Sequence, residues 1–233
     1  MVDYATAFKK PFTDVKKLII GILLSILPII SWFAMGFAIE CSGVGKNKKS
    51  KKMPDWDNWG DYFVKGLLST IIGILYALPA VLILFVGAGR FIFNIMQSSM
   101  HKMMPFAFKA VDASMIEIWM TNNWMNMFPG ILRIAPILLL SVLLGLLAAY
   151  LAPMAILNYI KKKNFGEAFN FKVVFKKAFT QDYFIVWIVV ALVFGFAGAI
   201  FNRIPWIGSA AVAFVMQVTG YTLFGEVYSQ SKN

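Results

Sequence analysis

The sequence alternates between long apolar blocks without charge and shorter charged segments. A helix rises 1.5 Å per residue, so about 20 residues cross the roughly 30 Å hydrocarbon core of a bilayer. Five blocks are long enough to do so, and together they cover about half of the 233 residues. We therefore predict an all-α polytopic integral membrane protein with one membrane domain over 1–233 and about five to six membrane-inserted helices. The five blocks are 18–39, 66–89, 134–160, 183–202 and 204–225.

The composition supports this class. Hydrophobic residues make up 60% of the chain and charged residues 14%, whereas soluble domains are about 45–50% apolar. Disordered chains need low hydrophobicity, so disorder is excluded. The net charge of +11 comes from lysines and arginines that flank the blocks, where membrane orientation accounts for them. Nucleic-acid binding is therefore not expected.

The distribution of basic residues predicts the orientation, because basic loops normally stay in the cytoplasm. If every block crosses once, the two sides receive 13 and 9 basic residues. If the block 18–39 turns back at Pro28, the split becomes 17 and 5. If 113–132 crosses in addition to the five blocks, the two sides receive 14 and 8 basic residues. A proline interrupts a helix, so both a re-entrant hairpin and a kinked single span remain open for 18–39.

Sixteen of the 22 basic residues lie in three segments, 1–17, 40–65 and 161–182. The hairpin alternative places all three on the same side. We predict that this side is the cytoplasmic face of the cell membrane in a multi-pass protein.

Three segments beside the blocks show amphipathic patterning typical of helices that lie in the membrane interface: 53–65, 91–132 and 161–181. In the first, Trp56, Trp59 and Phe63 recur on one face of a short helix, and tryptophan favours the headgroup level. The second holds eight of the 13 methionines, which favours an interfacial or partner-binding helix pair.

The third segment, 161–181, combines phenylalanines with six lysines, a composition that suits a leaflet carrying anionic lipid. A solvated charged connector is the alternative. In the lipid interpretation Phe165, Ala168, Phe169, Phe175, Ala178 and Phe179 form one stripe. The lysines around it are Lys161, Lys162, Lys163, Lys172, Lys176 and Lys177.

Small residues in the fourth block indicate close helix packing. Ala191, Gly195 and Ala199 recur every four residues and so share one helix face. This pattern predicts a tight helix contact, either within the chain or between chains.

Catalytic and metal-binding motifs are missing from the sequence. There is one cysteine and one histidine, and neither a zinc-protease nor a hydrolase motif occurs. The aspartates near Gly60 do not follow a calcium loop, because Trp59 and Gly66 occupy ligand positions. Met96, Met100 and His101 lack a second histidine or a cysteine to complete a copper site. We expect no cofactor, no metal and no enzymatic activity.

Short motifs with fixed spacing occur along most of the chain. They are Pro11-Phe12-x-Asp14, Pro54-x-Trp56-x-x-Trp59-x-x-x-Phe63-x-x-Gly66, Leu78-Pro79, Ala152-Pro153, Phe165-x-x-Ala168-Phe169-x-Phe171, Ile204-Pro205-x-x-Gly208 and Gly220-Tyr221. In these motifs the chain resembles the archaeal membrane family known as domain of unknown function 4013. This resemblance implies a polytopic α-helical membrane protein from an archaeon and implies no activity.

Two functions fit these observations. The first is a membrane-embedded scaffold or accessory subunit that binds lipid headgroups and another membrane protein or further copies of itself. The second is a transporter or channel for a small neutral or lipid-like solute. Intramembrane charges mark proton and ion pathways. Because the blocks contain none, a proton-coupled pump is disfavoured.

Overall fold

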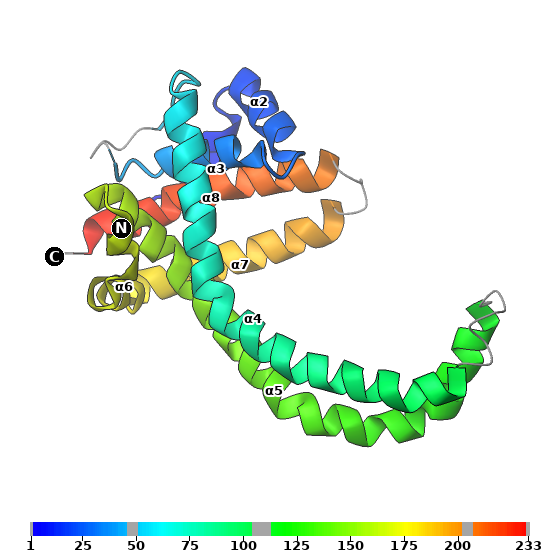
Figure 1. The fold of residues 1–233 in the computed structure, drawn as a ribbon. Coiled ribbons are helices and arrows are strands. Elements are labelled where there is room, and N and C mark those ends of the chain that lie inside the picture. Colours follow the sequence, from blue (N-terminus) through cyan, green and yellow to red (C-terminus); the bar gives the residue numbers. More distant parts are fainter. Residues whose placement is uncertain (1, 46–50, 104–112, 202–206, 232–233) are drawn as a thin grey trace. The chain divides into compact units, whose positions relative to one another are not determined.

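A computed structural model describes residues 2–45, 51–103, 113–201 and 207–231, with side chains between 88 and 133 described only at 89, 93 and 132. All regular elements in these ranges are helices (Figure 1). The chain divides into two compact units. The first contains Met1–Tyr76 and Ala149–Asn233, and the second contains Ala77–Ala148. The prediction of a single membrane domain stays a prediction.

Helix α8 (Ile207–Gln230) is the centre of the first unit. About 56% of its most apolar stretch is buried, compared with 11% for α7. Small residues such as Gly208, Ala210 and Gly220 let neighbouring helices approach α8 closely. Elements that contact α8 include α1 (Tyr4–Lys9), η1 (Lys10–Phe12), α2 (Val15–Ser25), α3 (Ser31–Glu40) and α7 (Gln181–Phe201).

The first apolar block forms two short helices, so the predicted break at Pro28 is confirmed. Helix α2 ends at Ser25 and α3 begins at Ser31, and the two helices contact each other. Their 11 and 10 residues correspond to about 16 and 15 Å, half of a hydrocarbon core. Gly21 lies against the ring of Phe214, where a Cβ atom would overlap the ring. Helix α2 is thereby held closely against α8.

Four helical stretches in the described residues are long and apolar enough to cross a membrane. They coincide with four of the five predicted blocks. The fifth block, 18–39, is divided between α2 and α3 and supplies no span of that length. The four stretches are Trp59–Gly87, Ile134–Lys162, Gln181–Phe201 and Ile207–Gln230.

The second unit is built from parts of α4 (Trp59–Met103) and α5 (Ala113–Lys162). Within it the Ser141 hydroxyl donates a hydrogen bond to the Ala80 carbonyl oxygen at 2.8 Å. A Cβ atom at Gly87 would overlap Ile137, so small residues allow this contact too. Phe85 is 75% exposed, as expected for a side chain that faces lipid.

The predicted interfacial pair at 91–132 is not a separate pair of helices. Residues up to Met103 continue α4, and residues from Ala113 begin α5. The methionines of this region lie outside the described side chains.

Candidate functional site

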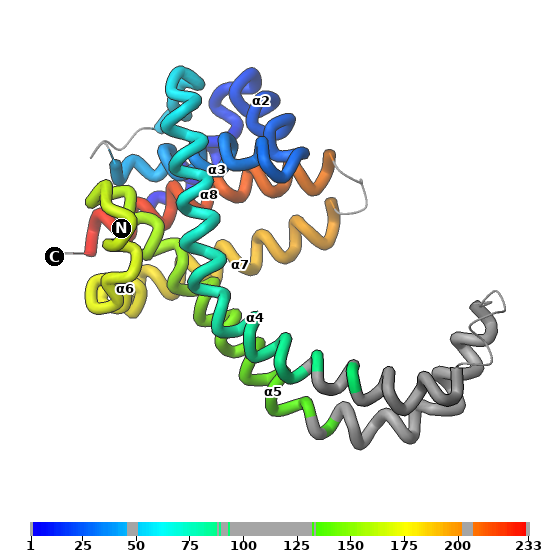
Figure 2. Tube along the Cα trace, in the orientation of Figure 1, coloured from blue at the N-terminus to red at the C-terminus, as the bar shows by residue number. Residues whose placement is uncertain are grey.

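The basic segments of the first unit meet at the C-terminal end of α8. Figure 2 shows this end of α8 on the same side of the unit as the marker of the N-terminus. The backbone N–H of Asp3 donates to Glu226 on α8 at 2.9 Å. The ammonium of Lys10 is 2% exposed and donates to the Cys41 carbonyl oxygen at 2.6 Å. Residues before α2 are therefore tied to the ends of both α3 and α8.

Two further lysines of the first unit form ion pairs with acidic residues. Lys17 pairs with Asp55 at 2.7 Å, which joins the start of α2 to the segment before α4. Lys65 lies 2.6 Å from both Glu40 and Asp61, which joins α4 to the end of α3. The first of these ion pairs joins the basic segment 1–17 to the segment 40–65.

The segment after α5 folds back in a tight turn. Lys163 has a φ of 53°, a left-handed conformation that ends α5. The Asn164 side chain then accepts a hydrogen bond from the Gly166 N–H and begins η2 (Phe165–Phe169). Asn158 donates to the Glu167 carbonyl oxygen at 2.7 Å and holds this turn against α5.

The predicted single helix over 161–181 is therefore wrong. The segment consists of the last turn of α5, η2 and α6 (Phe171–Ala178). Asn170, with φ −75° and ψ 77°, interrupts the helical path between η2 and α6. Asparagine often takes such positions because its side chain competes for backbone hydrogen bonds. The break also divides the predicted phenylalanine stripe.

Helix α6 buries a lysine and exposes phenylalanines. Its buried residues are Val174, Lys177 and Ala178. On the other face Phe171, Phe175 and Phe179 are 52, 39 and 64% exposed. This arrangement reverses the usual burial of apolar residues in water. It suits a helix whose outer face meets an apolar surface.

Lys177 fastens α6 to the end of α8. Its ammonium donates to the carbonyl oxygens of Tyr228 at 3.3 Å and Ser231 at 3.1 Å, and to the Ser231 hydroxyl at 3.1 Å. It also lies 4.1 Å from the centre of the Tyr228 ring, in a cation–π contact. A cation suits this place because carbonyl groups at a helix C-terminus lack partners. Burial lowers the pKa of Lys177, and the charges of Lys176 and Lys161 lower it further.

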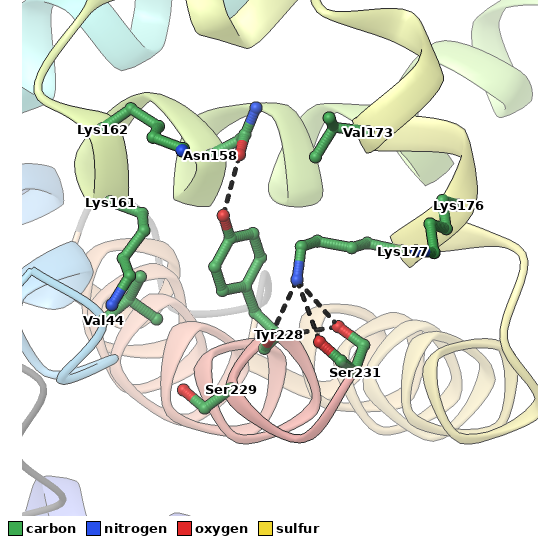
Figure 3. Close-up of a pocket in the computed structure, with 10 residues that line it drawn as sticks. All are labelled: Val44, Asn158, Lys161, Lys162, Val173, Lys176, Lys177, Tyr228, Ser229 and Ser231. Carbon is green, nitrogen blue, oxygen red and sulfur yellow. Dashed lines mark hydrogen bonds between the residues drawn. The ribbon is translucent and has the colours of Figure 1, made fainter. Parts of the chain in front are cut away.

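A polar pocket of about 790 Å³ lies among the ends of these helices (Figure 3). The Tyr228 hydroxyl donates to the Asn158 side-chain oxygen at 2.8 Å, and this bond joins α8 to α5 across the pocket. None of the ten described residues that line the pocket is acidic. They are Val44, Asn158, Lys161, Lys162, Val173, Lys176, Lys177, Tyr228, Ser229 and Ser231.

Four of the six predicted lysines line this pocket, and Lys163 and Lys172 are exposed outside its lining. The predicted phenylalanines separate into two groups. Phe175 belongs to the exposed row on α6. Phe165 and Phe169 are half-buried, and their ring centres lie 5.5 Å apart.

The tryptophan segment packs against α3. Residues 53–58 are not helical and α4 begins at Trp59, so the predicted short helix over 53–65 forms only from Trp59 onward, as the start of α4. Trp56 stacks on Phe37 with 3.9 Å between ring centres, and Trp59 lies 5.7 Å from Phe33. Phe63 lies 5.0 Å from Phe33. These rings form one aromatic cluster with α3, and a headgroup location for them stays a prediction.

The small-residue face of α7 has no neighbour at its central glycine. Ala191, Gly195 and Ala199 are exposed, and nothing lies within 4 Å of a Cβ atom placed at Gly195. Helix α7 instead packs through Tyr183, whose ring centre lies 5.5 Å from that of Phe224 on α8. The predicted tight contact through Gly195 is not made within the described residues.

Several pocket residues were not predicted from the sequence. Ser229 and Ser231 follow the last apolar block, and no local pattern marks them. Asn158 carried a signal, because it is the one asparagine in the block 134–160. Among the described residues, no group of three His, Cys, Asp or Glu side chains could hold a metal ion.

Comparison with known families places most of the chain in a family. The model of the family described as protein of unknown function, DUF4013, matches residues 19–223. The chain belongs to this family. The family match and the four long apolar helices identify a DUF4013 multi-pass membrane protein. No curated protein and no solved structure matches the chain.

Two motifs of this DUF4013 chain have a structural role. In the tryptophan motif, the rings of Trp56, Trp59 and Phe63 pack on α3, and a Cβ atom at Gly66 would overlap the Trp32 carbonyl oxygen. In the phenylalanine motif, Ala168 is fully buried and its carbonyl oxygen accepts from the Tyr76 hydroxyl at 2.6 Å. Both motifs therefore join elements that are distant in the sequence.

Proposed function

We propose that this DUF4013 protein is a non-enzymatic scaffold or accessory subunit of the cell membrane. In this proposal the basic end binds anionic lipid headgroups at the cytoplasmic surface, and the protein also binds a partner membrane protein. The sequence contains no catalytic motif that would suggest an enzyme. The proposal on lipid rests on α6, and the proposal on the partner needs a separate test.

The observation that carries the lipid proposal is the exposed phenylalanine row of α6. The ring centres of Phe171 and Phe175 are 6.2 Å apart, and those of Phe175 and Phe179 are 5.6 Å apart. Lys172 and Lys176 are exposed on the same short helix. Phenylalanine rings partition into the boundary between headgroups and acyl chains, while lysine ammonium groups reach the phosphates. Helix α6 therefore has the two features of an interfacial helix.

Orientation adds to this proposal. Anionic lipids are concentrated in the cytoplasmic leaflet, and each lysine near that surface contributes about 1 kcal/mol of attraction. The basic residues gathered at the end of α8 would lie at this surface under the positive-inside rule. A position at the cytoplasmic surface then accounts for both the basic residues at the end of α8 and the exposed phenylalanine rings of α6.

Spin labels test whether α6 lies in the interface. We expect labels at Phe175 and Phe179, in a Cys41→Ala background, to collide more with oxygen than with a water-soluble nickel complex when the protein is in vesicles containing phosphatidylglycerol. A label at Asn170, which is exposed at the start of α6, should show the opposite preference. Equal exposure to the nickel complex at all three positions would contradict the interfacial placement of α6.

Purification from native membranes tests the partner proposal. We expect mass spectrometry of the intact complex to find a second polypeptide in a fixed ratio to the DUF4013 chain. A single chain or a homo-oligomer that encloses an open polar cavity would contradict the accessory-subunit proposal. Such a result would favour a transporter instead.

A further inference from the structure

We infer that the pocket at the end of α8 is a binding site for a phosphate group. The group belongs either to an anionic lipid headgroup or to a free phosphate compound. This inference deepens the proposed function and, for a lipid ligand, rests on it, because it gives the headgroup a defined place to bind. Three features of the pocket support this inference: its lysines, the hydrogen bonds that hold its lining, and its volume.

Four lysine side chains line the pocket. Lys161 and Lys162 come from the end of α5, and Lys176 and Lys177 come from α6 (Figure 3). The described lining residues include no aspartate or glutamate. Like charges gathered from two helices repel each other, and an anion placed among them relieves this repulsion. Burial is the main cause of the lowered pKa of Lys177, and the further lowering by Lys176 and Lys161 agrees with a positive potential here.

The walls of the pocket are held by hydrogen bonds. Tyr228 donates to Asn158, and Asn158 donates to the turn at Glu167. Lys177 is committed to the end of α8 and is therefore a positioning residue. Lys161, Lys162 and Lys176 are exposed at the pocket and carry ammonium groups that can approach an anion. A lysine ammonium bonds phosphate oxygens with charge-assisted hydrogen bonds.

The size of the pocket suits a phosphate group with a substituent. Pockets for small molecules have volumes of about 300–1,000 Å³, and this pocket has about 790 Å³. An inorganic phosphate alone would leave much of this space to water. A phosphomonoester or a lipid headgroup would fill more of it.

Two charge-matched variants test the inference. The pocket variant replaces Lys161, Lys162 and Lys176 with glutamine. The control variant replaces Lys9, Lys16 and Lys51 with glutamine; these lysines are exposed and lie outside both the pocket lining and α6. Both variants lose three positive charges, so a difference between them reports the pocket. If the triple pocket variant does not fold, the double variant of Lys162 and Lys176 replaces it.

The lipid measurement is mass spectrometry of the intact protein in neutral detergent. Phosphatidic acid, phosphatidylglycerol and phosphatidylcholine are each added in turn. We expect the pocket variant to retain about tenfold less phosphatidic acid than wild type, because losing about 1.4 kcal/mol of binding energy lowers affinity tenfold. The control variant should stay within about twofold of wild type, which is less than 0.5 kcal/mol.

The measurement for free phosphate is thermal unfolding. A thiol-reactive dye follows the exposure of Cys41, which is 3% exposed in the folded protein. A ligand that binds only the folded state raises the unfolding temperature. We expect inorganic phosphate, compared with chloride at equal ionic strength, to raise this temperature in wild type and control more than in the pocket variant.

The two measurements distinguish the sources of the phosphate group. Loss of lipid retention alone identifies a headgroup site, and loss of the phosphate effect alone identifies a site for free phosphate. Loss of both also supports the inference. Equal behaviour of the pocket and control variants in both measurements overturns it. The spin-label experiment on Phe175 and Phe179 is independent, so the proposed lipid contact of α6 can succeed when the pocket inference fails.

Discussion

Cysteines introduced at Lys16, Lys51 and Lys172 are expected to react with a membrane-impermeant thiol reagent from the same side of sealed vesicles. A cysteine at Ile207 is expected to react only from the other side. All four positions are exposed. The effect is all or none, because the bilayer blocks the reagent.

The physical reason is the path of the chain around α8. Lys16 lies at the start of α2, and the ion pair between Lys17 and Asp55 connects this region to the segment that contains Lys51. Lys172 is on α6, which is fastened by Lys177 to the end of α8. Ile207 begins α8, and 24 residues of helix separate the two ends by about 36 Å.

The native cysteine makes this experiment simple. Cys41 is the single cysteine of the chain, and burial raises the pKa of its thiol to about 12. Since the thiolate is the reactive form, wild type serves as the negative control. The other variants carry Cys41→Ala. Labelling of Lys16→Cys and Lys51→Cys from opposite sides would show that 18–39 crosses as a kinked single span.

Alanine at Gly66 or Gly36 is expected to destabilise the fold by about 3 kcal/mol or more, the upper range for overpacking in a tightly packed core. A Cβ atom at Gly36 would overlap the carbonyl oxygen of Tyr62, and one at Gly66 would overlap that of Trp32. The obstacles are backbone atoms, which cannot rotate away as a side chain can. Helices α3 and α4 would have to separate, and the aromatic cluster of Phe37 would open.

Gly73→Ala provides the matched control on the same helix. Gly73 is in α4, and nothing lies within 4 Å of its Cβ position. Alanine is a better helix former than glycine by about 1 kcal/mol, so this variant should be as stable as wild type or more stable. Thermal unfolding followed through Cys41 measures all three variants. If Gly66→Ala and Gly73→Ala unfold at the same temperature, the close contact at Gly66 does not support the fold.

Most of the helices could be predicted because hydropathy is a local property. A run of about 20 apolar residues is sufficient for a span, and the spans that include 66–87, 134–160 and 183–201 follow directly from such runs. The break at Pro28 is local as well, because proline removes a backbone donor wherever it occurs. The interfacial segments were harder to predict, because a capping residue such as Asn164 or Asn170 divides a pattern that looks continuous by composition.

The pocket could be predicted only in part. The lysines of 161–177 stood out because six of them are close together in the sequence. Nothing local indicated that Lys177 is buried while Lys172 is exposed, since both lie on the same eight-residue helix. That difference arises from the end of α8, which offers carbonyl oxygens to one face of α6.

The sequence alone was sufficient to predict a helical chain in a lipid bilayer and the positions of four helices long enough to cross it. Each of these properties depends only on neighbouring residues and on the thickness of a bilayer. The tertiary structure decided which residues meet in the pocket. Val44, Asn158, Lys177 and Ser231 are far apart in the chain, and only the packing of α3, α5 and α6 around the end of α8 brings them together. The pocket therefore depends on contacts between distant residues, which no local pattern in the sequence records.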